Sequence, residues 1–201
     1  MPDSRQALSH LAALTACVLL FASSAQAQRR VVDPPPEPDI LTRADFHLGA
    51  SLLGSADERF AWDTHWGGDL DLVDYVRGRV TFFGDYQAVL GHELQPFDPN
   101  QGNYTLAVSS SLRLDVAELS VVFNHVSRHL GDRAKAFGIA MNVLGVRGLR
   151  EFAVGDMTVD LRVDAGRVIQ NAYIDYAWIV GADVLASQRL SPRVVAYVRA
   201  N

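Results

Sequence analysis

Beyond residue 27, no stretch of this chain is apolar for long enough to form a membrane-spanning helix, which needs about 20 consecutive apolar residues. The chain also has a single cysteine, Cys17, near its N-terminus. Its formal net charge is −5 at pH 7, so it lacks the basic surface that attracts nucleic-acid phosphates. These three features argue, in turn, against a helical membrane protein, a disulfide-stabilised fold and a nucleic-acid partner.

The first 27 residues have the three parts of a secretory signal peptide. Arg5 supplies a positive charge, residues 11–22 are almost wholly apolar, and residues 25–27 read Ala-Gln-Ala. Because about a dozen apolar residues are too few to cross a bilayer, we expect cleavage after Ala27 rather than an uncleaved anchor. About 174 residues would then remain, enough for one domain.

An alternative processing site is Cys17. Residues 14–17, Leu-Thr-Ala-Cys, form a lipobox in which Cys17 would be lipidated. Cleavage there would leave the apolar residues 18–21 on the mature chain, so cleavage after Ala27 is the preferred interpretation. It removes the only cysteine and leaves neither a disulfide nor a thiol nucleophile.

Residues 28–43 are expected to form a linker between the signal peptide, 1–27, and a folded domain, 44–201. Its segment 33–39 reads Asp-Pro-Pro-Pro-Glu-Pro-Asp and has no pattern that would bury a core. This composition predicts an extended, semi-rigid periplasmic spacer.

From residue 44 onward, apolar and polar residues alternate with a period of two, which is typical of β-strands. In the segment 156–164, Met157, Val159, Leu161 and Val163 alternate with charged residues and a threonine. The sequence predicts an all-β fold, an antiparallel up-and-down β-barrel of about 8–10 strands. The candidate strands, some of which could merge, are 44–54, 58–66, 69–76, 78–91, 103–115, 118–129, 135–147, 155–165, 171–186 and 192–200.

Alternation fits two kinds of protein. In a soluble sandwich the apolar face is the core, whereas in a membrane barrel it meets lipid and the polar face lines the lumen. The barrel is favoured because polar faces carry both charge signs, as at Asp160 and Arg162, and because several strands approach the ~9–11 residues needed to cross a bilayer. Aromatic residues near strand ends also suggest interfacial girdles. They are Phe60, Trp62, Trp66, Tyr75, Tyr104, Tyr173, Tyr176 and Trp178.

This interpretation places the protein in the bacterial outer membrane. A membrane protein without an apolar helix has to be a closed barrel, because lipid offers no other way to satisfy backbone polar groups. Its expected partners are outer-membrane lipid or lipopolysaccharide and the outer-membrane assembly machinery. The last residues, 198–201, lack the terminal aromatic residue that such barrels commonly have.

In the segment 119–132, three polar residues follow apolar residues on the same face of one expected strand. After the apolar residues of that face come His125, Ser127 and His129. If the face meets lipid, these residues lie at the membrane boundary, unless a bulge near Asn124 turns them into the lumen.

His125 is close enough to Ser127 to act as a general base, since residues i and i+2 on a strand share a face with their roots about 6–7 Å apart. A serine hydrolase also needs a carboxylate that holds the imidazole, and an oxyanion hole. Asp132, Glu118 and Glu151 are the available carboxylates. The alternative is a strand end rich in hydrogen-bonding residues and followed by a turn.

Residues 125–132, His-Val-Ser-Arg-His-Leu-Gly-Asp, resemble the H-x-S-S-H-L-G-D signature of a family of uncharacterised bacterial outer-membrane proteins, with Arg128 in place of the second serine. Residues 97–104 also resemble a loop of that family. The resemblance implies an outer-membrane barrel without a known activity. It makes His129, Asp132 and Arg128 candidate supporting residues.

A narrower resemblance is to lipid A deacylases, small outer-membrane barrels in which a membrane-facing His-x-Ser pair is followed by asparagine. It implies that His125 is the base and Ser127 the nucleophile. Arg128 occupies the position of the asparagine, and residues 138–140, Gly-Ile-Ala, lie where that family has a glutamate.

We expect neither a cofactor nor a metal. His125 and His129 are about 13 Å apart along a strand. His65, Asp63 and Arg59 are expected to share a strand face and form a lumenal hydrogen-bond network. The sequence therefore predicts an outer-membrane barrel with a structural, binding or narrow transport role. Two alternatives stay open: a lipid-modifying serine hydrolase at the outer leaflet, and a soluble periplasmic β-barrel that binds a small apolar ligand.

Overall fold

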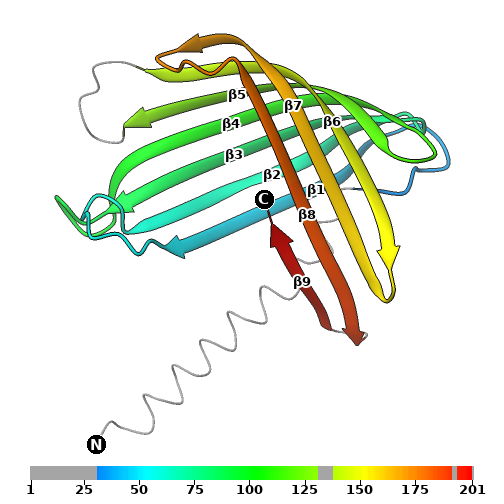
Figure 1. The fold of residues 1–201 in the computed structure, drawn as a ribbon, viewed down its shortest axis with the longest axis horizontal. Helices are drawn as coiled ribbons and strands as arrows, with labels where there is room; N and C mark the ends of the chain where they lie inside the picture. Colours follow the sequence, from blue (N-terminus) through cyan, green and yellow to red (C-terminus); the bar gives the residue numbers. More distant parts are fainter. Residues whose placement is uncertain (1–30, 131–137, 192–193, 201) are drawn as a thin grey trace, which may run out of the picture.

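The computed structural model describes residues 31–130, 138–191 and 194–200. Within them the chain forms nine antiparallel strands in one sheet, in sequence order (Figure 1). The strands are β1 (Asp39–Leu52), β2 (Trp62–Asp74), β3 (Arg79–Gly91), β4 (Asp98–Arg113), β5 (Glu118–Leu130), β6 (Ile139–Val154), β7 (Met157–Ala172), β8 (Trp178–Ser191) and β9 (Val194–Ala200). No helix in the described residues is long and apolar enough to cross a membrane.

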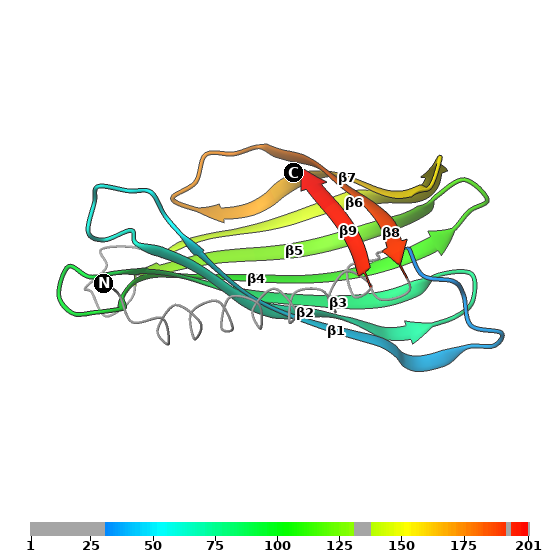
Figure 2. The same ribbon diagram turned by 90° about the horizontal axis from the view of Figure 1, so that it is seen from below.

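The sheet curls into a half-barrel, so that β6 to β8 cross in front of β1 to β3 (Figure 1), and the same curl is seen from below in Figure 2. Each strand pairs with its neighbours in the sequence, and the described strands include no pairing of β1 with β9. These observations confirm the predicted all-β, up-and-down fold. The proposed signal peptide and the alternative site at Cys17 lie outside the described residues.

Several strand boundaries differ from those expected. The segments 58–66 and 69–76 contribute to one strand, β2, and the expected strand 171–186 is divided between β7 and β8. β1 begins at Asp39, so residues 39–43 belong to the sheet rather than to the linker. Residues 98–104, which resemble part of a loop in the outer-membrane family with the H-x-S-S-H-L-G-D signature, form the first part of strand β4 here.

The two ends of the half-barrel have connections of different length. At the short-turn end, the connections have two to four residues: 75–78, 114–117, 155–156 and 192–193. At the long-loop end, they have five to nine residues: 53–61, 92–97, 131–138 and 173–177. β1 enters the sheet at the short-turn end, where Asp39 pairs with Asp74.

The two faces of the sheet differ in polarity. On the concave inner face, Asp71, Arg79 and Glu118 are only 0–5% exposed, and the buried apolar side chains of the described residues are few and all aliphatic, such as Val122 and Leu185. On the opposite, outer face, large apolar side chains are exposed, up to 79% at Leu48. They include Phe46, Leu48, Trp66, Leu106, Val108, Leu112, Leu119, Val121, Phe123, Leu144, Val146, Val163, Val180 and Val198. The apolar face of this sheet is therefore the exposed one, and the charged face is the enclosed one.

Candidate functional site

The predicted catalytic pair lies on the outer face of β5. The pairing of β5 with β4 and with β6 has no register shift, so side chains alternate regularly along the strand. His125, Ser127 and His129 therefore share the face of Phe123, and the bulge considered near Asn124 does not occur. The Ser127 hydroxyl makes no hydrogen bond to a described residue, although His125 is its neighbour on this face.

Two of the three candidate supporting residues can be placed. Arg128 points to the inner face, where its Nε donates to Asn103 Oδ1 at 3.3 Å, so the structure does not bring it to the pair. His129 stays on the outer face and contacts Tyr104 edge to face, with ring centroids 5.5 Å apart. Asp132 lies outside the described residues.

The partner of His125 is an asparagine on the neighbouring strand. Asn142 of β6 pairs directly with His125 across the ladder, and its Oδ1 lies 2.7 Å from His125 Nδ1. An amide oxygen can only accept a hydrogen bond, so Nδ1 carries the proton and Nε2 is left as the basic nitrogen. This is the tautomer that a general base requires.

The hydrogen-bonded chain continues onto a third strand. Asn142 Nδ2 donates to Gln170 Oε1 of β7 at 2.8 Å. His125, Asn142 and Gln170 thus form a polar chain across β5, β6 and β7. We call these three residues and Ser127 the outer polar cluster.

The carboxylates considered from the sequence are not part of this cluster. Glu118 is buried on the inner face, where both its oxygens bond to Arg79. Glu151 lies near the short-turn end of β6, paired in the ladder with Asp160 of the inner face. Asn142 was not identified from the sequence. Its signal is that it is polar, whereas the next two residues on the same face of the strand, Leu144 and Val146, are apolar.

A row of aromatic rings leads to the cluster across the outer face. Trp66 of β2 contacts Tyr86 of β3 with centroids 5.6 Å apart, and Tyr86 contacts Tyr104 of β4 at 4.7 Å. Tyr104 is the ladder partner of Ser127. The row therefore ends beside the proposed nucleophile, in the half of the sheet nearer the long-loop end.

The outer face also has an apolar groove of about 830 Å³. Its lining includes Leu112, Leu119, Val121, Val146 and Val163. Two of these residues precede His125 on β5, toward the short-turn end. The outer polar cluster is therefore bordered by apolar surface along its own strand.

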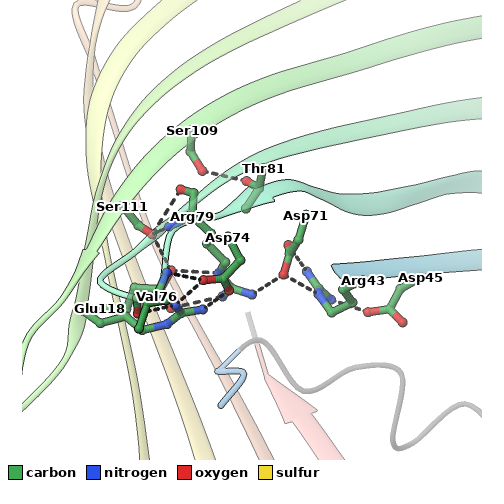
Figure 3. Close-up of polar contacts among 11 residues, drawn as sticks. Arg43, Asp45, Asp71, Asp74, Val76, Arg79, Thr81, Ser109, Ser111 and Glu118 are labelled. Atoms are coloured by element: carbon green, nitrogen blue, oxygen red, sulfur yellow. Dashed lines mark hydrogen bonds and ion pairs between the residues drawn. The ribbon is translucent and has the colours of Figure 1, made fainter. Parts of the chain in front are cut away.

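The inner face is crossed by ion pairs near the short-turn end (Figure 3). Arg79 Nη1 donates to Asp71 at 2.7 Å, and Arg79 Nε donates to Glu118 at 2.8 Å. Ser111 donates to Glu118 at 2.6 Å, and Arg43 of β1 bonds to Asp71 at 3.3 Å. Because Asp71, Arg79 and Glu118 are almost fully buried, this network occupies the inner side of β2, β3 and β5 near the short-turn end with paired charges.

A second ion pair holds the turn between β2 and β3 (Figure 3). Arg113 Nη2 lies 2.6 Å from Asp74 Oδ2, and Arg113 Nη1 donates to the carbonyl of Val76 at 2.9 Å. Val76 has a φ of 69°, a left-handed conformation that is strained for a β-branched residue. The contacts with Asp74 and Arg113 hold it there.

Toward the long-loop end, the inner face carries histidines and aspartates. His47 Nε2 is 2.7 Å from one oxygen of Asp85, and His65 Nδ1 is 2.9 Å from the other. His65 also lies 3.4 Å from Asp63, but Arg59 lies in the connection 53–61, outside β2, and pairs with Asp57 instead. Among the described residues, no group of three or more His, Cys, Asp or Glu side chains is arranged to hold a metal ion.

No family model, curated protein or solved structure matches this chain. The resemblances noted in the sequence are therefore still predictions. The features that bear on function are the polarity of the two faces and the outer polar cluster.

Proposed function

We propose that this protein is an integral β-barrel of the bacterial outer membrane, with its outer face in contact with lipid. The observation that carries the proposal is the reversed polarity of the two faces. Soluble monomers rarely expose an apolar patch of more than a few hundred Å². Fully burying one large aliphatic side chain contributes about 1.5–3 kcal/mol, and this sheet leaves more than a dozen such side chains uncovered. In a membrane these side chains would contact hydrocarbon instead of water, which removes the free-energy cost of exposing them.

The strand connections support a direction of insertion. Outer-membrane barrels have short periplasmic turns and longer extracellular loops. The short-turn end, where β1 enters from the preceding segment, would then be periplasmic. The row Trp66, Tyr86 and Tyr104 would lie toward the outer leaflet, as interfacial aromatic residues do.

The inner network bears on what such a barrel would do. Barrels of about eight to ten strands have a lumen that side chains can fill. Buried pairs such as Arg79 with Asp71 and Glu118 occupy the inner side near the short-turn end. We therefore propose a structural or binding role rather than that of an open pore.

Fractionation combined with gel migration tests the location. We expect the protein in the outer-membrane fraction, soluble only with detergent, with different migration in heated and unheated samples. Recovery as a soluble periplasmic monomer, with the same migration in both samples, would overturn the proposal and favour the soluble ligand-binding alternative.

A second candidate function is hydrolysis of an acyl ester in outer-leaflet lipid. The observation that favours it is the 2.7 Å contact between His125 Nδ1 and Asn142 Oδ1, with Ser127 on the same face. Asparagine orients the catalytic histidine in papain-like proteases, so a carboxylate is not obligatory in this position. In the ligand-free state, the bond between nucleophile and base is often long and shortens when substrate binds.

The reaction would run in two steps. Ser127 Oγ attacks the ester carbonyl carbon while His125 Nε2 takes the hydroxyl proton, and that proton passes to the departing alcohol as its C–O bond breaks. Water then attacks the acyl-serine and gives a proton to Nε2, which returns it to Ser127 as the fatty acid leaves. Asn142 holds the imidazole throughout and stabilises its protonated form.

The location of these polar groups is itself an argument for function. Transfer of an amide or hydroxyl into an environment without hydrogen-bonding partners costs roughly 2–7 kcal/mol. Polar side chains are therefore rare on a lipid-facing surface and tend to mark functional sites. The outer polar cluster places four of them together between apolar neighbours.

Replacing Ser127 with alanine tests the hydrolase. The substrate is purified lipopolysaccharide in detergent, and released fatty acid is measured by mass spectrometry. We expect release by the wild type and by Ser110→Ala, a control on the outer face of β4, and none by Ser127→Ala. Equal release by all three proteins would remove the hydrolase and leave the membrane barrel standing.

A further inference from the structure

We propose that Gln170 is the positioning residue of the outer polar cluster: it holds the Asn142 amide in the one orientation that presents its oxygen to His125. This inference rests on the proposed hydrolase. It is carried by the hydrogen-bond chain across three strands and by a local irregularity in β7 that places Gln170 in that chain.

The irregularity is an extra residue in β7. Asn142 pairs with Gln170, but the next residue of β6, Val143, pairs with Val168, so Ile169 has no partner in the ladder. In a regular ladder Ile169 would stand opposite Asn142, because antiparallel strands pair residue by residue. The bulge thus replaces an apolar neighbour of Asn142 with an amide. Bulges next to active sites commonly redirect a side chain in this way.

The hydrogen-bond chemistry explains what Gln170 contributes. The two ends of the Asn142 amide differ only in whether they donate or accept. With Oε1 of Gln170 as acceptor, Asn142 has to present Nδ2 to it, which leaves Oδ1 for His125. A flipped Asn142 would place an N–H donor against Nδ1 and favour the tautomer with the proton on Nε2. That tautomer cannot accept the proton of Ser127.

A lipid-facing position strengthens the influence of Gln170 on the orientation of the Asn142 amide. In water, Asn142 would satisfy either orientation with solvent, so a partner would have little influence on it. Away from water a polar group without a partner is costly, so the Gln170 amide, in the orientation that presents Oε1 to β6, selects the orientation of Asn142. Gln170 would act through Asn142 and His125 and would not touch the ester.

Two substitutions of Gln170 distinguish the effect of its acceptor oxygen from the effect of its side-chain size. Gln170→Met keeps the length and removes the acceptor, whereas Gln170→Glu keeps acceptor oxygens. The readout is the rate at which a fluorophosphonate probe labels the serine in detergent micelles. We expect a loss of up to roughly 100-fold for Gln170→Met, the cost of about 1 Å of misplacement at a reacting group. Labelling by Gln170→Glu should stay close to the wild-type rate.

A second readout separates positioning from general damage. In ¹⁵N NMR spectra, the His125 ring should show one neutral tautomer, protonated at Nδ1, in the wild type and in Gln170→Glu. In Gln170→Met it should show a mixture. Leu161→Met, on the outer face of the same strand and outside the apolar groove, is the matched control and should change neither the tautomer nor the labelling rate. Heat-dependent gel migration confirms that each variant folds.

The outcomes distinguish the two proposals. If Gln170→Met is labelled at the wild-type rate and retains a single tautomer, Gln170 has no positioning role and the hydrolase stands. If the wild type is labelled no faster than Ser127→Ala, the hydrolase itself fails and the role of Gln170 falls with it.

Discussion

Replacing Val146 with arginine tests whether the outer face meets lipid or water. Val146 lies within β6, pairs with Val121 of β5, and is 60% exposed. In water, a substitution at so exposed a position should change the free energy of folding by no more than about 0.5 kcal/mol. In a bilayer, arginine on the lipid face of a barrel costs about 2–4 kcal/mol at the midplane. The two environments therefore predict clearly different results.

The larger cost corresponds to a roughly 30- to 700-fold shift of the folding equilibrium, at about 1.4 kcal/mol for each factor of ten. It can be measured by refolding from urea into phospholipid vesicles, with the folded fraction read from heat-dependent gel migration. Val154→Arg, next to the turn at 155–156, is the depth control. Because the penalty falls to about 0–1 kcal/mol near the interfaces, this variant should stay close to the wild type.

The result that would refute the reasoning is a Val146→Arg protein whose folding free energy lies within about 0.5 kcal/mol of the wild type. The outer face would then be in contact with water, and the reversed polarity would need another explanation. A large loss for both Val146→Arg and Val154→Arg would contradict the proposed position of the turn at a membrane interface.

Three further outcomes are expected. Arg79→Met should destabilise the folded state by about 3–5 kcal/mol in urea titrations, because Asp71 and Glu118 lose the guanidinium that compensates their buried charge; a change below 1 kcal/mol would show that the network is dispensable. Val76→Asn should stabilise the protein by about 1 kcal/mol in the same titrations, since asparagine tolerates a φ of 69° better than valine does. Asn142→Leu should slow labelling of the nucleophile by up to about 10⁴-fold, the loss seen when a triad histidine adopts the wrong tautomer, and labelling at the wild-type rate would exclude Asn142 from the mechanism.

The pattern of alternation within the chain was enough to identify the fold class and the faces of individual strands. His125, Ser127 and His129 were correctly placed on one face, because side-chain alternation is a local property of an extended backbone. The candidate strands 58–66 and 69–76 merge into β2 across a glycine pair, Gly67 and Gly68. These residues continue β2, and a Cβ at Gly67 would lie 2.1 Å from the Gly84 carbonyl oxygen, so the close approach of β3 explains the glycine.

The tertiary structure decided what local periodicity leaves undetermined. Alternation shows that a strand has an apolar and a polar face, but only the curl of the sheet shows that Asp71 and Arg79 are on the enclosed side. The partner of His125 depended on the register between β5 and β6, and Gln170 reached Asn142 only through an extra residue in β7. Register and bulges are relations between strands, set by pairing at a distance along the chain, so single-strand patterns do not contain them.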